Sequence, residues 1–145
     1  ISKEDGLLLV GHGGLGSGNS SYGNLQFKLI RDGLTNVRIA VLENAPYVAD
    51  VAMPWEWLDG KRPNTIYVHP LLLVLGDHAQ NDLFGDEEDS VINELADYGY
   101  EVKPIHSALG EYEAIQDIFR QHVQDCIDDL YGKRSPHRPT IPNIK

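Results

Sequence analysis

The chain has 145 residues, of which 41% are hydrophobic and 23% charged, values that suit one globular domain and exclude a disordered, collagen-like or fibrous chain. Its charge is uneven: residues 1–131 carry eight Lys and Arg against 22 Asp and Glu, a net charge of −14, whereas residues 132–145 carry four basic residues and no acidic one. Because so acidic a body repels phosphate backbones and attracts cations, no nucleic-acid partner is expected.

Strands and helices are predicted to alternate along the whole chain. Short apolar runs indicate buried strands, and apolar residues at helical spacing indicate amphipathic helices, with Gly33 and Gly99 as stops. The third strand is expected to continue as an apolar extension through Leu75, and the second helix to bend near Pro54. In chain order we expect a strand at 7–10, a Gly/Ser-rich loop at 11–21, a helix at 22–32, a strand at 37–42, a helix at 47–58, a strand at 65–68, helices at 77–84 and 86–98, a strand at 101–105 and a long amphipathic helix at 111–131.

This alternation predicts the fold class, a doubly wound α/β domain with a mainly parallel four-stranded sheet and helices on both faces. The strands are apolar on both sides, as in parallel sheets that helices cover from each side. The domain is expected to span residues 1–131. Residues 132–145 contain three prolines and no apolar periodicity, so we expect a basic, Pro-rich tail that is extended or disordered.

No membrane partner and no disulfide are expected. The longest apolar run, residues 71–75, is far shorter than the roughly 20 residues that cross a bilayer. Cys126 is the only cysteine in the sequence and has no partner for an internal disulfide, which fits a reducing compartment. No charged-then-apolar leader is recognised, and together these features predict a cytoplasmic protein.

Three candidate metal ligands follow the predicted strands. His12 comes after the first strand between glycines, Glu43 ends the second, and His78 follows the third. Function collects beyond the carboxyl ends of strands in such sheets, so these side chains are expected to face one crevice. Two imidazoles and a carboxylate suit Co²⁺, Ni²⁺, Fe²⁺ or Zn²⁺ and leave an open coordination position. Asp77 and Asp82 lie near His78 in the sequence and can orient its imidazole.

The remaining histidines are weaker candidates. His106 ends the fourth strand and can line the same crevice. His69 lies inside the third strand region and is expected to be packed. His122, on the last helix, and His137, in the tail, are expected to be exposed to solvent.

Two further segments have both a structural and a functional interpretation. The acidic run at residues 86–89 is expected to be the solvated start of a helix, and the alternative is a cation-attracting rim beside His78. Of Trp55 and Trp57, one is expected to pack and the other to cover a surface, and the alternative is a stacking wall for a planar ligand.

A nucleotide-binding Rossmann-like domain is one alternative for the whole chain. Residues 11–16 match G-x-G-x-x-G after a strand, and Glu43 lies near the position of a ribose-binding acid. However, residues 17–20 delay the helix that a dinucleotide turn should open. A non-catalytic metal-binding or metallochaperone domain, with the same three ligands, is a second alternative.

Several motifs together resemble one family. They are Gly11-His12-Gly13, Glu43 with Pro46, Pro70-Leu71 with Leu73-Val74, Gly76-Asp77-His78-Ala79 with Asn81-Asp82, and Leu109-Gly110-Glu111. Over residues 7–131 the chain resembles the anaerobic-type sirohydrochlorin cobaltochelatases, which belong to the class II tetrapyrrole chelatases. The G-D-H-A-x-N-D stretch is the most specific part of this resemblance.

The resemblance implies insertion of a divalent metal into sirohydrochlorin or a related tetrapyrrole, for cobalamin-type biosynthesis. Co²⁺ is the expected metal substrate, with Ni²⁺ and Fe²⁺ as alternatives, and no organic cofactor is expected. Members of this type have two similar halves, and this chain resembles the carboxyl-terminal half, so a homodimer or a homologous second half-domain is the expected partner. The implied metal-binding and catalytic residues are His12, Glu43 and His78, and the implied tetrapyrrole contacts are Gly13, Gly14, Leu109 and Gly110.

Overall fold

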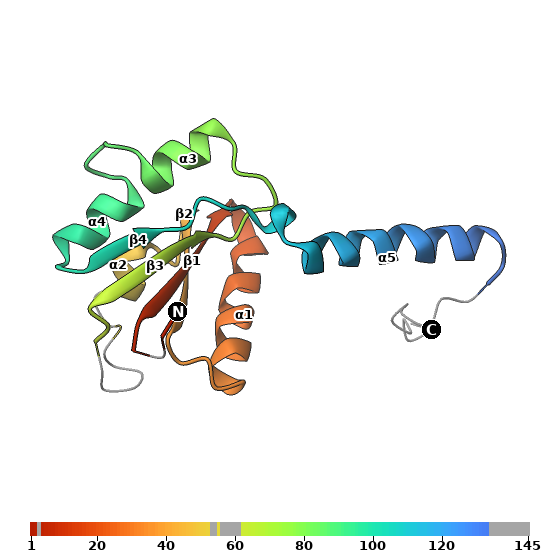
Figure 1. Ribbon diagram of the computed structural model, residues 1–145, viewed down its shortest axis with the longest axis horizontal. Helices are drawn as coiled ribbons and strands as arrows, with labels where there is room; N and C mark the ends of the chain where they lie inside the picture. Colours follow the sequence, from red (N-terminus) through yellow and green to blue (C-terminus); the bar gives the residue numbers. More distant parts are fainter. Residues whose placement is uncertain (3, 53–54, 56–61, 134–145) are drawn as a thin grey trace. The chain divides into compact units, whose positions relative to one another are not determined.

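A computed structural model describes residues 1–2, 4–52, 55 and 62–133, and it contains a four-stranded, all-parallel sheet in the order β2-β1-β3-β4 (Figure 1). The predicted doubly wound α/β fold is thereby confirmed. The strands are β1 (Gly6–Gly13), β2 (Val37–Glu43), β3 (Thr65–Pro70) and β4 (Glu101–Pro104). The helices are α1 (Ser20–Arg31), α2 (Val48–Ala52), α3 (Asp77–Phe84), α4 (Val91–Asp97) and α5 (Glu113–Leu130), with short 3-10 turns η1 (Gly16–Asn19) and η3 (Leu109–Glu111).

Successive side chains of β1, one of the two inner strands, point to opposite faces of the sheet. Leu8 and Val10 are fully buried in a core that also holds side chains of β3, α2, α3 and α4. On the other face, α1 packs so closely that a Cβ on Gly11 would lie 2.4 Å from the Tyr22 ring. Helices therefore cover both faces of the sheet, α2 and α4 on one side and α1 on the other (Figure 1).

The free edge of β2 is closed by one side chain of α1. The Gln26 amide donates to the Val37 carbonyl at 3.0 Å and accepts the Ile39 N–H at 2.8 Å. An edge strand otherwise presents a row of unpaired backbone groups. Gln26 thus makes the two hydrogen bonds that a neighbouring strand would otherwise make to β2, and it links α1 to the sheet.

Two predicted elements are wrong in their extent. The apolar extension to Leu75 is not strand, because β3 ends at Pro70, and residues 71–76 form a loop in which Leu73 and Val74 are exposed. The helix predicted at 86–98 begins only at Val91. The Asn93 amide donates to the Glu87 carbonyl at 2.8 Å, and this contact holds the acidic run at residues 86–89 as a turn before the helix rather than as its first turn.

The predicted second helix is observed only as the short α2. Pro54 and Trp57 lie outside the described residues, so the bend at the one and the surface role of the other stay predictions. Of the tail expected at 132–145, the structure describes only residues 132–133. Among the described residues, no helix combines the length and hydrophobicity that crossing a bilayer requires.

Backbone contacts divide the chain into two compact units, residues 1–109 and 110–145. The second unit contains α5, which is amphipathic as predicted. Its apolar residues Ile118, Phe119 and Val123 are 50%, 50% and 61% exposed, and α5 has no buried residue. The sheet and the three candidate metal ligands described below belong to the first unit.

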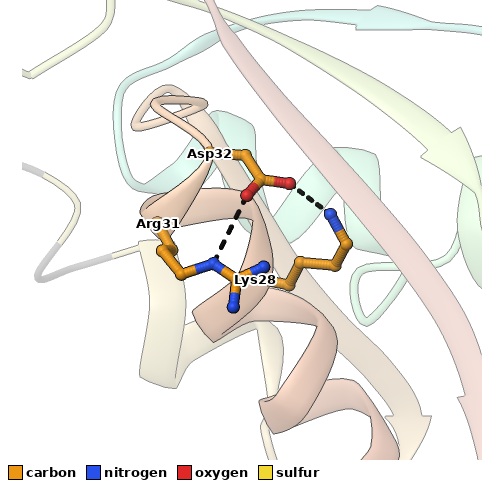
Figure 2. Close-up of polar contacts among 3 residues, drawn as sticks. All are labelled: Lys28, Arg31 and Asp32. Atoms are coloured by element: carbon orange, nitrogen blue, oxygen red, sulfur yellow. Dashed lines mark hydrogen bonds and ion pairs between the residues drawn. The ribbon is translucent and has the colours of Figure 1, made fainter.

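The carboxyl end of α1 carries a small ion-pair cluster (Figure 2). Asp32 accepts hydrogen bonds from the Lys28 ammonium and from Arg31 Nε, the latter at 3.4 Å. The Lys28 hydrogen bond is the main reason that the pKa of Asp32 lies below its usual value of 3.8. A lowered folded-state pKa means that this carboxylate stabilises the fold at neutral pH, and that the contribution is lost as the pH falls through the folded-state pKa.

Asp32→Asn should therefore lower the melting temperature slightly near pH 7, by less than about 3 °C for so exposed a pair. The difference from the unsubstituted chain should disappear at an acidic pH below the folded-state pKa, where the carboxylate is protonated in both folded and unfolded states. Thermal denaturation followed by circular dichroism at the two pH values measures this, with Glu88→Gln as the control for loss of an exposed carboxylate elsewhere. An equal difference at both pH values would contradict the ion-pair explanation.

Candidate metal and tetrapyrrole site

The carboxyl edge of three neighbouring strands carries the three predicted ligands. His12 is the next-to-last residue of β1, Glu43 is the last residue of β2, and His78 is the second residue of α3, which follows β3 after a six-residue loop. Since β1 lies between β2 and β3, the three residues come from adjacent positions of one sheet edge. All three side chains are exposed.

The glycines beside His12 are explained by close backbone packing. Gly13 pairs with Glu43 in the sheet register, and a Cβ on Gly13 would lie 2.1 Å from the Glu43 carbonyl oxygen. Gly13 also has φ +81°, a conformation that L side chains rarely adopt. On its other flank, Gly11 lies against Tyr22, whose hydroxyl accepts the Gly13 N–H at 3.4 Å. The glycines therefore let β1 end in contact with both Tyr22 and the last residue of β2.

The two imidazoles have different polar neighbours. His12 Nδ1 lies 3.4 Å from the Gly13 carbonyl oxygen. His78 Nδ1 lies 3.7 Å from Asp82 Oδ1, one helical turn later, and the His78 side chain is 90% exposed. In each case a proton on Nδ1 leaves the Nε2 lone pair available to a metal, the arrangement in which an oxygen partner orients a ligating imidazole.

The ligands do not form a closed metal site in the structure. Within the described residues, no group of three or more His, Cys, Asp or Glu side chains is arranged to hold a metal ion. Strand alternation explains this openness: His12 has the parity of Leu8 and Val10, whereas Glu43 is opposite Gly13. The side chains of His12 and Glu43 therefore start from positions that face opposite sides of the sheet. How close the imidazole and the carboxylate can come depends on the loops that follow β1 and β2.

Acidic side chains line a shallow cavity of about 220 Å³ near this edge. Asp82 of α3 contributes to it together with Glu87 and Asp89 of the following turn. Because Asp82 is also the neighbour of His78, the acidic run supplies part of a negative surface beside that imidazole. The run is a solvated turn directly before α4, and its role as a cation-attracting rim stays a prediction.

Of the other histidines, His69 and His122 lie as the sequence predicts. His69 is 8% exposed, with Nδ1 2.7 Å from the Pro70 carbonyl oxygen, and His122 is exposed on α5. His106 follows β4 at the same sheet edge as the candidate ligands and packs edge-on against Phe84, with ring centroids 4.6 Å apart. His137 lies outside the described residues.

The residues implied as tetrapyrrole contacts occupy two places. Gly13 ends β1, and Gly14 follows it with its carbonyl bound to the Asn44 amide. The Leu109 N–H donates to the Leu72 carbonyl at 2.8 Å, which joins the start of η3 to the loop after β3. Gly110 begins the second unit, where its carbonyl accepts a hydrogen bond from Gln116.

Trp55 is excluded as a stacking wall. It is 1% exposed, the Arg38 guanidinium lies 5.2 Å from its ring centroid, and its carbonyl accepts a hydrogen bond from Arg38 at 3.2 Å. It is thus the packed member of the Trp pair, as expected.

The glycine-rich fingerprint also departs from a dinucleotide turn. A 3-10 turn, η1, begins at Gly16, and α1 begins only at Ser20. The third glycine of the motif therefore does not open the helix whose N-terminus would bind a pyrophosphate.

Three residues of the site were not singled out from the sequence: Tyr22, Asn19 and Asn44. Tyr22 supports the glycines of β1, and the two asparagines bind backbone carbonyls across the loops that follow β1 and β2. Asn19 directly precedes a helix and Asn44 precedes Ala45-Pro46, so both carry ordinary cap or turn signals. Those signals do not reveal contacts with a distant loop.

Comparison with known proteins identifies the family. A profile described as "Cobalt chelatase (CbiK)" matches residues 1–128. The chain is 27% identical over 128 residues to a sirohydrochlorin cobaltochelatase of Salmonella typhimurium, covering 88% of this chain and 47% of that protein. It is likewise 27% identical over 127 residues to the sirohydrochlorin cobaltochelatase CbiKC of Nitratidesulfovibrio vulgaris, covering 88% of this chain and 44% of the relative.

The chain therefore spans about half the length of these two relatives. A crystal structure of a cobalamin (vitamin B12) biosynthesis CbiX protein from Marinobacter aquaeolei has the same fold, with a TM-score of 0.66 and 17% identity over 88% of this chain and 98% of that one. The match to the family profile covers most of the sequence, and the chain belongs to the cobalt chelatase (CbiK) family.

Proposed function

We propose that this chain inserts a divalent metal ion, Co²⁺ in the first place, into sirohydrochlorin or a related tetrapyrrole. The observation that carries the proposal is the position of His12, Glu43 and His78 at one edge of three neighbouring strands, in a chain of the cobalt chelatase family. Both similar cobaltochelatases are named for sirohydrochlorin, which supports that substrate.

The chemistry of insertion matches the residues at this edge. The macrocycle gives up two pyrrole protons as the metal enters, so a catalyst must hold a partly dehydrated metal, accept protons and release both products. Neutral imidazoles of His12 and His78 bind the metal through nitrogen, and the Glu43 carboxylate balances its charge and can take a proton. Because these side chains are exposed, they can turn toward one ion when it arrives. Gly13 and Gly14 leave room beside them for a flat ring.

The negative charge near the candidate ligands indicates that this chain binds the metal ion rather than the carboxylates of the tetrapyrrole. The acidic cavity lined by Asp82, Glu87 and Asp89 attracts cations. Sirohydrochlorin carries many carboxylates, which this acidic surface would repel. Its carboxylates therefore need basic groups, either from this chain or from a partner.

The candidates for these basic groups on this chain are Arg31, Arg38, Lys61, Arg62 and the basic tail, and the three arginines, which the structure describes, have other contacts. Arg38 is buried against Trp55, Arg31 pairs with Asp32, and Arg62 lies 4.4 Å from the centroid of the Tyr100 ring. Lys61 and the basic tail residues Arg134, Arg138 and Lys145 lie outside the described residues. A second half-domain is therefore one source of groups that bind the substrate carboxylates, and the basic tail is the other.

We accordingly infer that the working unit contains two half-domains, either two copies of this chain or this chain beside a homologous half. One edge forms a single wall for a flat macrocycle, whereas binding pockets normally bury most of a ligand's surface. A two-fold dimer is the commonest soluble oligomer and would place two such edges face to face. The half-length match to the relatives supports the same conclusion.

Metal insertion into sirohydrochlorin, followed by absorbance with Co²⁺, Ni²⁺ and Fe²⁺ in turn, tests the proposal. Light scattering on the same sample gives the oligomeric state. Insertion by a dimer supports both parts, and insertion at full rate by a monomer overturns the shared cleft. Cobalt binding by a dimer without any insertion favours the metallochaperone alternative, and nicotinamide dinucleotide binding without metal binding favours the nucleotide alternative.

A further inference from the structure

Two asparagine side chains join the loop after β1 to the loop after β2. Asn19 Nδ2 donates to the Glu43 carbonyl at 3.1 Å and to the Ala45 carbonyl at 3.0 Å. In the opposite direction, Asn44 Nδ2 donates to the Gly14 carbonyl at 2.9 Å. Each loop thus contributes one amide that binds the backbone of the other, and we name these three hydrogen bonds the asparagine clasp.

The hydrogen bonds of the clasp are made at or next to two of the candidate ligands. They bind the carbonyls of Glu43 itself and of Ala45, and in the loop after β1 they bind the carbonyl of Gly14, two residues after His12. The backbone turns sharply at both places, with φ +81° at Gly13 and +67° at Asn44. Since strand alternation directs His12 and Glu43 from alternate positions, these turns decide how closely the two side chains can approach.

We propose that Asn19 and Asn44 are positioning residues that set the spacing between the His12 imidazole and the Glu43 carboxylate for metal binding. The inference rests on the proposed function, because it assigns a role within that metal site. The three contacts are exposed, so water can replace the amides at the carbonyls, and loss of the clasp should cost little folding stability. What water cannot restore is a fixed distance between the two loops.

The sharpest test is the Asn19→Ala variant, which removes two of the three hydrogen bonds at a residue with ordinary helical backbone angles, φ −67° and ψ −15°. Titration calorimetry with CoCl₂ should show an affinity lower by about tenfold, the lower end of what removal of a residue that orients a ligand costs. The visible absorption bands of the bound Co²⁺ should also change, because they report the geometry of its ligands. Asn44→Gly, which tolerates the positive φ, removes the remaining bond and should weaken binding by a smaller factor.

Asn36→Ala is the matched control. Asn36 also donates to two backbone carbonyls, those of Ser2 at 3.4 Å and Asp5 at 3.0 Å, but it lies before β2, at the amino-terminal edge of the sheet. It should lower the melting temperature about as much as Asn19→Ala and leave Co²⁺ affinity and spectrum unchanged. An equal loss of affinity in Asn36→Ala, or unchanged affinity and spectrum in Asn19→Ala, would overturn the positioning role.

The same titration separates failure of this inference from failure of the proposed function. If His12→Ala weakens Co²⁺ binding and Asn19→Ala does not, only the positioning role is wrong. If His12→Ala leaves Co²⁺ binding as it is in the unsubstituted chain, the metal site itself is wrong, and the role of the clasp falls with it.

Discussion

His12→Ala and His78→Ala should each weaken Co²⁺ binding by at least about tenfold and reduce metal insertion in proportion, because two remaining ligands do not replace three. Both side chains are exposed, and neither belongs to the core, so the substitutions should leave the melting temperature nearly unchanged. Titration calorimetry with CoCl₂ gives the affinity, and absorbance of sirohydrochlorin gives the insertion rate.

His122→Ala is the control for loss of an exposed imidazole, since His122 lies on α5 and is not one of the candidate ligands. It should bind Co²⁺ as the unsubstituted chain does. Glu43→Gln, which keeps the shape of the side chain and removes its charge, should weaken binding in the same direction as the histidine variants. Unchanged affinity in both His12→Ala and His78→Ala would eliminate this set of ligands.

Gly13→Ala should impair both the fold and the site. The new Cβ would lie 2.1 Å from the Glu43 carbonyl oxygen and 3.0 Å from Val41 Cβ, at a φ of +81°. Forced overlap of this kind costs about 1–3 kcal/mol, and the left-handed backbone adds roughly 1 kcal/mol or more. Because the overlap is with backbone rather than with a flexible side chain, the end of β1 must move away from β2, which separates His12 from Glu43.

Thermal denaturation should show a melting temperature lower by about 4–16 °C for Gly13→Ala, from about 2–4 °C for each kcal/mol in a domain of this size. Calorimetry should show weaker Co²⁺ binding in the same variant. Gly18→Ala is the control in the following turn, because a Cβ there meets nothing within 4 Å and its φ is not positive. If the two variants are equally stable and bind Co²⁺ equally well, the close contact between the ends of β1 and β2 has no role.

Local sequence patterns predict the order of elements and the positions of the candidate site residues along the chain. Apolar periodicity is a local property, so it located β1, β2, α3 and the amphipathic α5 to within a few residues. The rule that parallel strands present their carboxyl ends at one edge of the sheet predicts that His12, Glu43 and His78 lie at that edge. Burial of His69 and exposure of His122 followed from the same periodicity.

Which side chains meet across that edge depends on how distant segments of the chain pack together in three dimensions. The apolar run at residues 71–75 has the composition of a strand, yet it leaves the sheet after Pro70. The pairing of Gly13 with Glu43, rather than of His12 with Glu43, depends on the register between β1 and β2. Asn19 meets the carbonyls of Glu43 and Ala45 across separations of 24 and 26 residues. Register and such long-range contacts arise when distant segments pack together, and local sequence patterns carry no record of them.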